Sequence, residues 1–392
     1  MPELDKERLE AYLSSVYKTP VHIVSIREIG KEGVSGLKGF GYGIPYVISF
    51  SIDSEVKRVV LETMSPNSFG HDHFSDRAQG LLWNHSAFNR LPGHVRSIDA
   101  GAFTPDGEII SVGKAEEFFI LTEFEEGDGY NQDLKRIAST GKMGSMDEDR
   151  AKALAGYLAS IHRVKLNAPH LYTRRIRDLI GHGECIMGLI DNYPPGHSFI
   201  TSNLLQRIEE GCVAWRWKIK GLGHRLCQVH GDFHPWNILF REGTDYTVLD
   251  RARGEWGEPA DDVGTMAINY IFFSLQRYGR LEGPFERLYF TFWETYMDAA
   301  EDVEMLKVIQ PFLAWRGLVI ANPLWYPALS PDVRKGLFHF IENVLAVEEF
   351  RPEKVNEYLE RRSDERRLCY MDHGTAGLRK NRFGRGHHPQ AR

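Results

Sequence analysis

The chain has 392 residues, of which 42% are hydrophobic and 26% charged, and its formal net charge is −6. This composition is that of an ordinary globular protein of one large or two smaller domains, and it provides no overall basic field for nucleic acid. The four cysteines are scattered and no run approaches roughly 18 uninterrupted apolar residues, which argues against a disulfide framework, a zinc module and a membrane span.

The beginning of the chain predicts a short helix and no targeting segment. Residues 1–9 are rich in charge and lack the apolar core of a signal peptide. Leu9, Leu13 and Val16 recur at helical spacing, and Pro20 follows the expected end of this helix. Together with the cysteine pattern, these features predict a cytoplasmic protein.

The residues that follow have the pattern of a small β-sheet with one interposed helix. Short β-type runs alternate with turn residues such as Asp53-Ser54, and a helical run ends at Pro92-Gly93. The expected strands span residues 21–29, 46–52, 56–64, 95–103 and 118–124, and the expected helix spans residues 74–91.

After Gly127 the pattern becomes mainly helical. Residues 147–165 carry Ala151, Leu154 and Leu158 on one face, which predicts an amphipathic helix. Further helical runs span residues 202–219, 261–278, 285–297, 302–315, 332–345 and 353–361, and one hairpin joins 238–240 to 247–249. We therefore predict an α+β protein with an N-terminal lobe over 1–124 and a helical C-terminal lobe over 125–360.

The last residues, 361–392, contain nine Lys or Arg against three Asp or Glu and little apolar periodicity. We interpret them as a disordered basic tail without a partner. A tail that binds anions or nucleic acid is the alternative interpretation. Nothing in the sequence indicates the oligomeric state.

The segment His230–Asn237 carries the strongest chemical signal, and it reads His-Gly-Asp-Phe-His-Pro-Trp-Asn. Phosphoryl transfer requires a protein to hold metal ions against a triphosphate and to orient the attacking hydroxyl. Asp232 can accept or orient the proton of that hydroxyl. Asn237 offers an uncharged oxygen to Mg²⁺, and the predicted hairpin then delivers a second carboxylate, Asp250.

These residues resemble the aminoglycoside phosphotransferase / choline kinase-like family. The match consists of His-Gly-Asp-(x)4-Asn, the later Asp250, and the segment 257–262, which reads Gly-Glu-Pro-Ala-Asp-Asp. The resemblance implies a bilobal protein-kinase-like fold with a small antiparallel sheet and one helix in the N-terminal lobe. It also implies a kinase that uses ATP and Mg²⁺ to phosphorylate a small-molecule hydroxyl on an aminoglycoside, amino alcohol or sugar-like compound. By the same alignment, Asp262 caps the following helix and ties down the catalytic loop.

The resemblance also assigns nucleotide contacts. The segment 122–127 is similar to the family's hinge, where the backbone of Thr122 and Phe124 meets the adenine. The glycine-rich residues 36–43 lie where a phosphate-covering loop belongs, and Gly39 and Gly41 would let backbone N–H groups approach the phosphates. A plain flexible turn is the alternative for this loop.

Two positions depart from the family pattern. Glu62 stands about where a kinase-like third strand carries a Lys, and the expected helix 74–91 contains no Glu but has Arg77 in its first turn. Our hypothesis is that Arg77, oriented by Glu62, provides the positive charge for the phosphates. The alternatives are an exposed Glu62 and, for the whole protein, a kinase-like nucleotide-binding pseudoenzyme that acts as a sensor or interaction module.

Arginine, tryptophan and histidine side chains near these segments allow further interpretations. Arg251 and Arg253 follow Asp250 and could neutralise transferred charge, although surface arginines are the simpler interpretation. Trp236 and Trp256 flank the catalytic segments and are the tryptophans best placed for an ammonium or sugar-like acceptor. His230 is expected to fix the loop backbone, as opposed to acting as a base.

Overall fold

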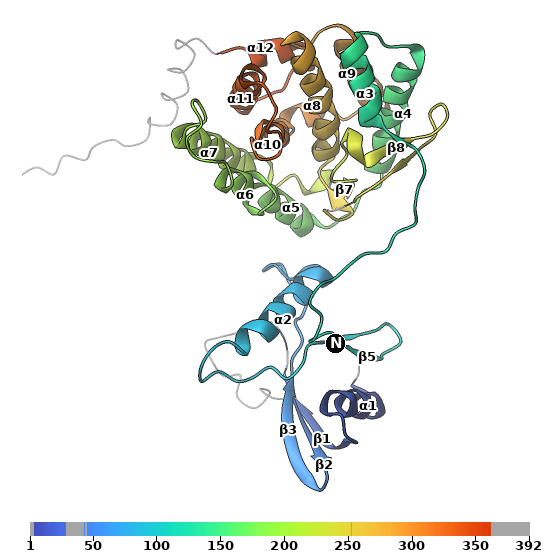
Figure 1. Ribbon diagram of the computed structural model, residues 1–392, viewed down its shortest axis with the longest axis vertical. Helices are drawn as coiled ribbons and strands as arrows, with labels where there is room; N and C mark the ends of the chain where they lie inside the picture. Colours follow the sequence, from blue (N-terminus) through green and yellow to red (C-terminus); the bar gives the residue numbers. More distant parts are fainter. Residues whose placement is uncertain (1–3, 29–42, 44, 252, 362–392) are drawn as a thin grey trace, which may run out of the picture. The chain divides into compact units, whose positions relative to one another are not determined.

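The computed structural model describes residues 4–28, 43, 45–251 and 253–361. The chain divides into two compact units, Met1–Glu123 and Phe124–Arg392, which we call the small and the large unit. Figure 1 shows a mixed small unit and a mainly helical large unit, so the predicted α+β class is confirmed. The basic tail from residue 362 onward and the glycines Gly39 and Gly41 lie outside the described residues.

The small unit contains a three-stranded antiparallel sheet with β2 in the centre. Its strands are β1 (His22–Glu28), β2 (Tyr46–Ile52) and β3 (Glu55–Leu61). Asp53 and Ser54 have φ values of 46° and 72°, which is the left-handed pair that a two-residue hairpin turn requires. One face of the sheet packs on helix α1 (Lys6–Tyr17), where Leu9 and Leu13 join Phe50 in the core.

The rest of the small unit contains helix α2 (Phe74–Phe88) and a short hairpin of β4 (Gly101–Phe103) and β5 (Ile109–Ser111). The strand predicted over 95–103 is therefore reduced to its last three residues. The strand predicted over 118–124 is wrong, because these residues form neither helix nor strand. A strand needs a hydrogen-bonded neighbour, and no strand of the described chain pairs with this apolar run.

The large unit is built around helices that enclose α8. Its helices are α3 (Tyr130–Thr140), α4 (Ser145–His162), α5 (Pro169–Gly181), α6 (Ile186–Asp191), α7 (Ser202–Ile219), α8 (Pro259–Tyr278), α9 (Gly283–Ala300), α10 (Gln310–Ala321), α11 (Pro331–Leu345) and α12 (Val355–Leu359). Every residue of α8 from Pro259 to Leu275 is buried, as expected of a helix that is covered on all sides. The helices α3, α4, α9 and α10 pack against it.

Short elements connect these helices. They are the 3₁₀ turns η1 (Gly223–Arg225), η2 (Pro235–Asn237), η3 (Val303–Lys307) and η4 (Pro352–Lys354), and the strands β6 (Asp128–Gly129), β7 (Cys227–Gln228), β8 (Ile238–Phe240), β9 (Tyr246–Val248) and β10 (Trp256–Gly257). The single helix predicted over 302–315 is wrong, because the chain forms η3 and then restarts at α10. Pro311 explains the restart, since a residue without an N–H fits only the first turn of a helix.

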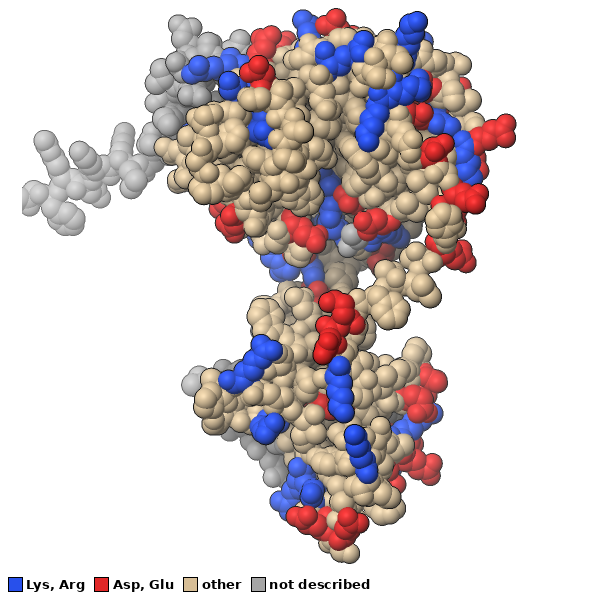
Figure 2. Space-filling view, viewed as in Figure 1, with Lys and Arg blue, Asp and Glu red and all other residues tan. Residues whose placement is uncertain are grey.

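The surface charges of the large unit are mixed in sign, and the helices of the described chain lack the length and apolar content of a membrane span. Figure 2 shows acidic and basic side chains interspersed over this face of the large unit, with no field of a single sign. No helix in the described chain is both long and apolar enough to span a membrane. The cysteines Cys185, Cys212 and Cys227 are buried free thiols.

Candidate active site

The buried carboxylate of Asp262, on α8, accepts hydrogen bonds from the backbone of the loop 230–237. Its two oxygens accept the backbone N–H groups of His230 and Gly231, both at 2.7 Å. The same carboxylate lies 3.1 Å from Nε2 of His162, whose Nδ1 is 2.8 Å from the hydroxyl of Tyr296. Burial alone would raise the pKa of Asp262, but the contact with His162 and the backbone N–H of His230 outweigh it and lower the pKa.

The predicted role of Asp262 in tying down the loop therefore matches its contacts, whereas its predicted role as the cap of α8 is wrong. The N-cap residue of α8 is Glu258, whose side chain accepts the N–H of Ala260 at 3.3 Å. Because Asp262 lies one turn further into the helix, its carboxylate is free to face the loop.

Gly231 is required by the path of the loop. Its φ is +86°, in the left-handed region that favours glycine. A Cβ at this position would lie 3.4 Å from Cβ of Arg253 and 3.6 Å from Nη2 of Arg175. His230 is buried, and its Nδ1 accepts the N–H of Asp232 at 3.3 Å, in agreement with the expectation that it fixes the backbone.

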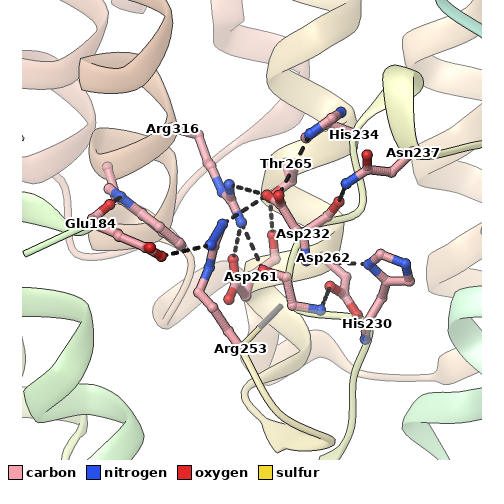
Figure 3. Close-up of polar contacts among 12 residues, drawn as sticks. Glu184, His230, Asp232, His234, Asn237, Arg253, Asp261, Asp262, Thr265 and Arg316 are labelled. Atoms are coloured by element: carbon pink, nitrogen blue, oxygen red, sulfur yellow. Dashed lines mark hydrogen bonds and ion pairs between the residues drawn. The ribbon is translucent and has the colours of Figure 1, made fainter. Parts of the chain in front are cut away.

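Asp232 is clamped by two arginines (Figure 3). Its Oδ1 accepts Nη2 of Arg253 and Nη1 of Arg316, both at 2.7 Å, and its Oδ2 lies 3.6 Å from Nε2 of His234. Burial alone would raise the pKa of Asp232. The interaction with His234 and the charges of both arginines outweigh burial and hold the pKa far below its ordinary value. Asp232 is therefore an ionised, oriented carboxylate at neutral pH.

A second layer of charge holds these arginines. Arg316 also donates to Oδ1 of Asp261 at 2.9 Å and to the carbonyl of Gly231 at 3.1 Å. Arg175 donates to Oδ2 of Asp261 at 2.7 Å and to the carbonyl of Arg253 at 3.2 Å. The carboxylate of Asp261 thus joins Arg175 of α5 to Arg316 of α10, which contacts the loop at Gly231. All these groups belong to the large unit, and Figure 3 shows Asp261 and Arg316 near Asp232.

Asn237 directly precedes the hairpin β8–β9, and Asp250 follows it two residues after the end of β9. The register pairs Ile238 with Val248, and the N–H of Leu249 donates to the carbonyl of Asn237 at 2.8 Å. The side-chain amide nitrogen of Asn237 donates to the carbonyl of Asp232 at 3.1 Å, so its amide oxygen remains as the group that can meet a cation. Asp250 follows the hairpin and is exposed.

Asp250 has a strained backbone. Its φ is +56°, which costs about 1 kcal/mol for a residue with a Cβ. The next residue, Arg251, donates to the carbonyls of Val229 and Glu255 at 2.9 and 3.1 Å and holds the segment in this conformation. A cavity of about 290 Å³ opens beside Asp250. Its walls are formed by Tyr157, Ile161, Gln228, Val229, His230, Val248, Leu249 and Arg251.

Glu62 and Arg77, the charged residues predicted to act together, lie in the small unit and do not contact each other within the described residues. Glu62 is exposed and follows the last residue of β3; because Val59 and Leu61 pack on the core, alternation directs Glu62 to the opposite face. Nη1 of Arg77 donates to three carbonyls just before or at the start of α2, those of His71, Asp72 and His73, at 2.9 to 3.1 Å. No ion pair joins Glu62 to Arg77 within the described residues, so the predicted pairing is wrong.

Thr122 and Phe124 lie between β5 and β6 in a stretch without helix or strand, and both are exposed. Trp236 is 37% exposed and stacks on Phe273, whereas Trp256 pairs with Gln228 in β10 and β7. The surface interpretation is confirmed for Arg251, which is exposed although it donates to two backbone carbonyls. It is wrong for Arg253, whose side chain is largely buried and donates to Asp232.

The sequence analysis missed Arg316. It sits in the run Phe-Leu-Ala-Trp-Arg-Gly-Leu-Val-Ile-Ala, and it is the one charged residue of the otherwise apolar α10. A buried charge needs a partner, so this position was itself a signal. The partners, Asp232 and Asp261, are distant in sequence, and the pattern alone could not identify them.

Comparison with known proteins confirms the predicted resemblance. Residues 113–301 match the sequence model of the phosphotransferase enzyme family, a stretch that contains the loop 230–237, Asp250 and Asp262 and ends before α10. No curated protein matches the chain. Similar solved structures include Plasmodium vivax ethanolamine kinase (14% identity over 86% of this chain and 80% of that chain, TM-score 0.34) and a glucosamine kinase (14% identity over 92% and 100%, TM-score 0.39). Choline kinase from Cryptosporidium parvum Iowa II is a third (16% identity over 89% and 88%, TM-score 0.32).

Proposed function

We propose that this protein is an ATP- and Mg²⁺-dependent phosphotransferase that transfers the γ-phosphate to a hydroxyl of a small molecule. The observation that carries the proposal is the state of Asp232, an ionised carboxylate fixed by Arg253 and Arg316 next to Asn237. The match of residues 113–301 to the phosphotransferase enzyme family supports it independently.

In the proposed reaction, the acceptor oxygen forms a bond to the γ-phosphorus while the bond from that phosphorus to the β,γ-bridging oxygen breaks. ADP leaves with the electron pair of the broken bond, and the hydroxyl proton passes to the product phosphate or to water. Asp232 has a pKa far too low for an effective base at neutral pH, so its role is to accept the hydroxyl's hydrogen bond and aim its oxygen. A loose transition state requires little proton removal before the oxygen attacks.

Asn237 and Asp250 are the proposed ligands of Mg²⁺. An amide oxygen and a carboxylate are hard oxygen donors, and Mg²⁺ is commonly held by one or two carboxylates together with substrate phosphates. No group of three or more His, Cys, Asp or Glu side chains that could hold a metal ion occurs in the described part of the chain. A site completed by phosphate oxygens fits this sparse donor set, and the cation would offset charge on the phosphates.

The nucleotide contacts remain proposals from the resemblance. They are the backbone of Thr122 and Phe124 for the adenine, Gly39 and Gly41 for the phosphates, and Arg77 as a cation. Arg77 already donates through Nη1 to three carbonyls, so a phosphate role would use its remaining N–H groups.

Two measurements test this function. A thermal shift with Mg²⁺·ATP measures nucleotide binding, because a ligand that binds only the folded state stabilises it. Release of ADP in the presence of aminoglycosides, amino alcohols and sugars measures transfer, and Asp232→Asn should abolish it. ATP-induced stabilisation without turnover of any acceptor would instead favour a nucleotide-binding pseudoenzyme, for which the exposed Glu62 in place of a lysine is the motivating feature.

A further inference from the structure

The charges around Asp232 indicate the chemical class of the acceptor, if the proposed phosphotransfer is correct. Arg175, Arg253 and Arg316 bring three positive charges to this cluster, whereas the two carboxylates bonded to them, Asp232 and Asp261, bring two negative charges. These hydrogen-bonded groups alone thus have one positive charge in excess, which the carboxylate of Glu184 offsets from 3.6 Å. In the proposed function, Asp232 contacts the reacting hydroxyl. The positive charge of the arginines bonded to Asp232 therefore lies close to the bound acceptor.

Arg253 is the arginine that carries the available charge. Its side chain is 14% exposed, against 6% for Arg316. Arg175 is 13% exposed, but its charge is directed to the buried Asp261. The other charged neighbour of Arg253 is Glu184, whose carboxylate lies 3.6 Å from Nη1, beyond hydrogen-bonding distance (Figure 3). Glu184 is 65% exposed, and ion pairs with a partner so accessible to water contribute little to stability. An anionic ligand can therefore displace this carboxylate at little cost.

Both guanidinium groups also have unmet hydrogen-bonding capacity. The Nε atoms of Arg253 and Arg316 are buried and have no hydrogen-bond partner within the described residues. Buried donors are nearly always paired in folded proteins, so unpaired donors beside a candidate catalytic carboxylate point to a ligand that supplies acceptor oxygens.

The aromatic surroundings argue against a cationic acceptor. The buried ring of Trp315 lies 3.8 Å from the guanidinium carbon of Arg316 and 4.8 Å from that of Arg253. This ring thus already contacts two of the protein's own cations, with which an ammonium group would have to compete. An ammonium next to Arg253 would also meet like-charge repulsion in a partly buried setting.

We propose that the acceptor is an anionic hydroxyl compound, whose carboxylate or phosphate group binds Arg253 in place of Glu184. The planar guanidinium can bind either oxyanion through two parallel hydrogen bonds. Arg253 is then a specificity-determining residue, while Arg316, which is more deeply buried, positions Asp232.

The experiment compares acceptors that share a carbon skeleton, keep at least two free hydroxyls and differ in charge. One set consists of glucosamine, glucose, gluconate and glucose 6-phosphate, and a three-carbon set consists of 2-aminopropane-1,3-diol, glycerol, glycerate and glycerol 3-phosphate. The full-length protein is assayed for ADP release with Mg²⁺·ATP, and the thermal shift caused by each compound is measured without ATP. We expect kcat/KM at least about ten-fold higher for an anionic member than for the cationic member of its set, on the scale of one charge-assisted hydrogen bond. The two anions in each set distinguish a carboxylate from a phosphate.

Two variants connect this preference to the residues. Glu184→Gln should lower KM for the anionic acceptor by about two- to five-fold and leave the neutral one unchanged, because it removes the competing carboxylate. Glu349→Gln, which removes another exposed carboxylate from the segment after α11, is the matched control and should change neither. Arg253→Gln should raise KM for the anion by about 10- to 100-fold, with partial rescue by Arg253→Lys, whereas any change in kcat should be common to all acceptors.

A cationic acceptor that is phosphorylated as efficiently as its anionic counterpart would overturn the inference and leave the phosphotransferase proposal intact. The inference is also wrong if none of the anionic compounds is phosphorylated and none of them raises the melting temperature of the protein. The phosphotransferase proposal fails separately, by the absence of both Mg²⁺·ATP binding and transfer to any acceptor.

Discussion

Arg316 offers the sharpest test of how the site is held together. The substitution Arg316→Met keeps an unbranched side chain as far as the position of Nε but removes the charged group that Asp232 and Asp261 share. Removing one partner of a buried ion pair costs about 3–5 kcal/mol. Since Arg253 still contacts Asp232 and Arg175 still contacts Asp261, we expect the lower end, about 3 kcal/mol, or a fall in melting temperature of roughly 6–12 °C for a unit of this size.

The pH dependence separates this effect from a general loss of packing. The folded-state pKa of Asp232 is lowered, so its ion pairs stabilise the folded state fully above the unfolded pKa of about 3.9 and lose their contribution as the pH falls below that value. The difference in unfolding free energy between wild type and Arg316→Met should thus be constant between about pH 5 and 8 and shrink below about pH 4.

The matched control is Arg334→Met. Arg334 is also a buried arginine, but its partners are the carbonyls of Ala321, Leu329 and Tyr326, which do not titrate. Its loss should destabilise the protein by an amount that does not depend on the state of Asp232, with kcat unchanged. Arg316→Met should in addition lower kcat by about 10- to 100-fold, because Asp232 is less well oriented. Urea unfolding at several pH values and steady-state kinetics measure both; an Arg316→Met protein with wild-type kcat and a pH-independent loss of stability would refute the reasoning.

Three further substitutions test the loop. Gly231→Ala should destabilise the protein by about 1–2 kcal/mol in chemical denaturation and lower kcat, because a Cβ is strained at φ +86°; an unchanged midpoint would contradict this. Asp262→Asn should cost about 3 kcal/mol and reduce turnover, because one amide oxygen cannot replace a carboxylate that accepts two backbone N–H groups, and calorimetry would detect the loss. Asp250→Asn should leave the melting temperature nearly unchanged, since Asn tolerates the left-handed backbone, but should abolish Mg²⁺-dependent transfer; retained activity across a Mg²⁺ titration would exclude Asp250 as a ligand.

Features with a local cause could be predicted from the sequence. The helix predicted over 202–219 has the same bounds in the structure, because its apolar period and its Thr201 cap are properties of the segment itself. The turn at Asp53-Ser54 was predictable for the same reason. The order of Asp232, Asn237 and Asp250 along the chain likewise allowed the loop and its hairpin to be expected before the contacts were known.

Features that depend on distant partners could not be predicted. The run 118–124 has strand propensity, but pairing is decided by a neighbour that the sequence does not specify, and the structure provides none. The proposed pairing of Glu62 with Arg77 failed because the guanidinium found nearby carbonyls. Similarly, the double clamp on Asp232 joins residues that are 21 and 84 positions away along the chain.

The burial of Asp262 and Arg316 also determines how the site should respond to thermal motion. The N–H groups of His230 and Gly231 donate to a carboxylate at the start of α8, and Arg316 reaches the same loop from α10, which packs on α8. These amides can exchange with solvent only when the helical core itself opens, so their hydrogen-exchange protection should approach that of α8. Heat inactivation should then coincide with cooperative unfolding of the large unit, without an earlier phase in which a still folded protein has lost its catalytic loop.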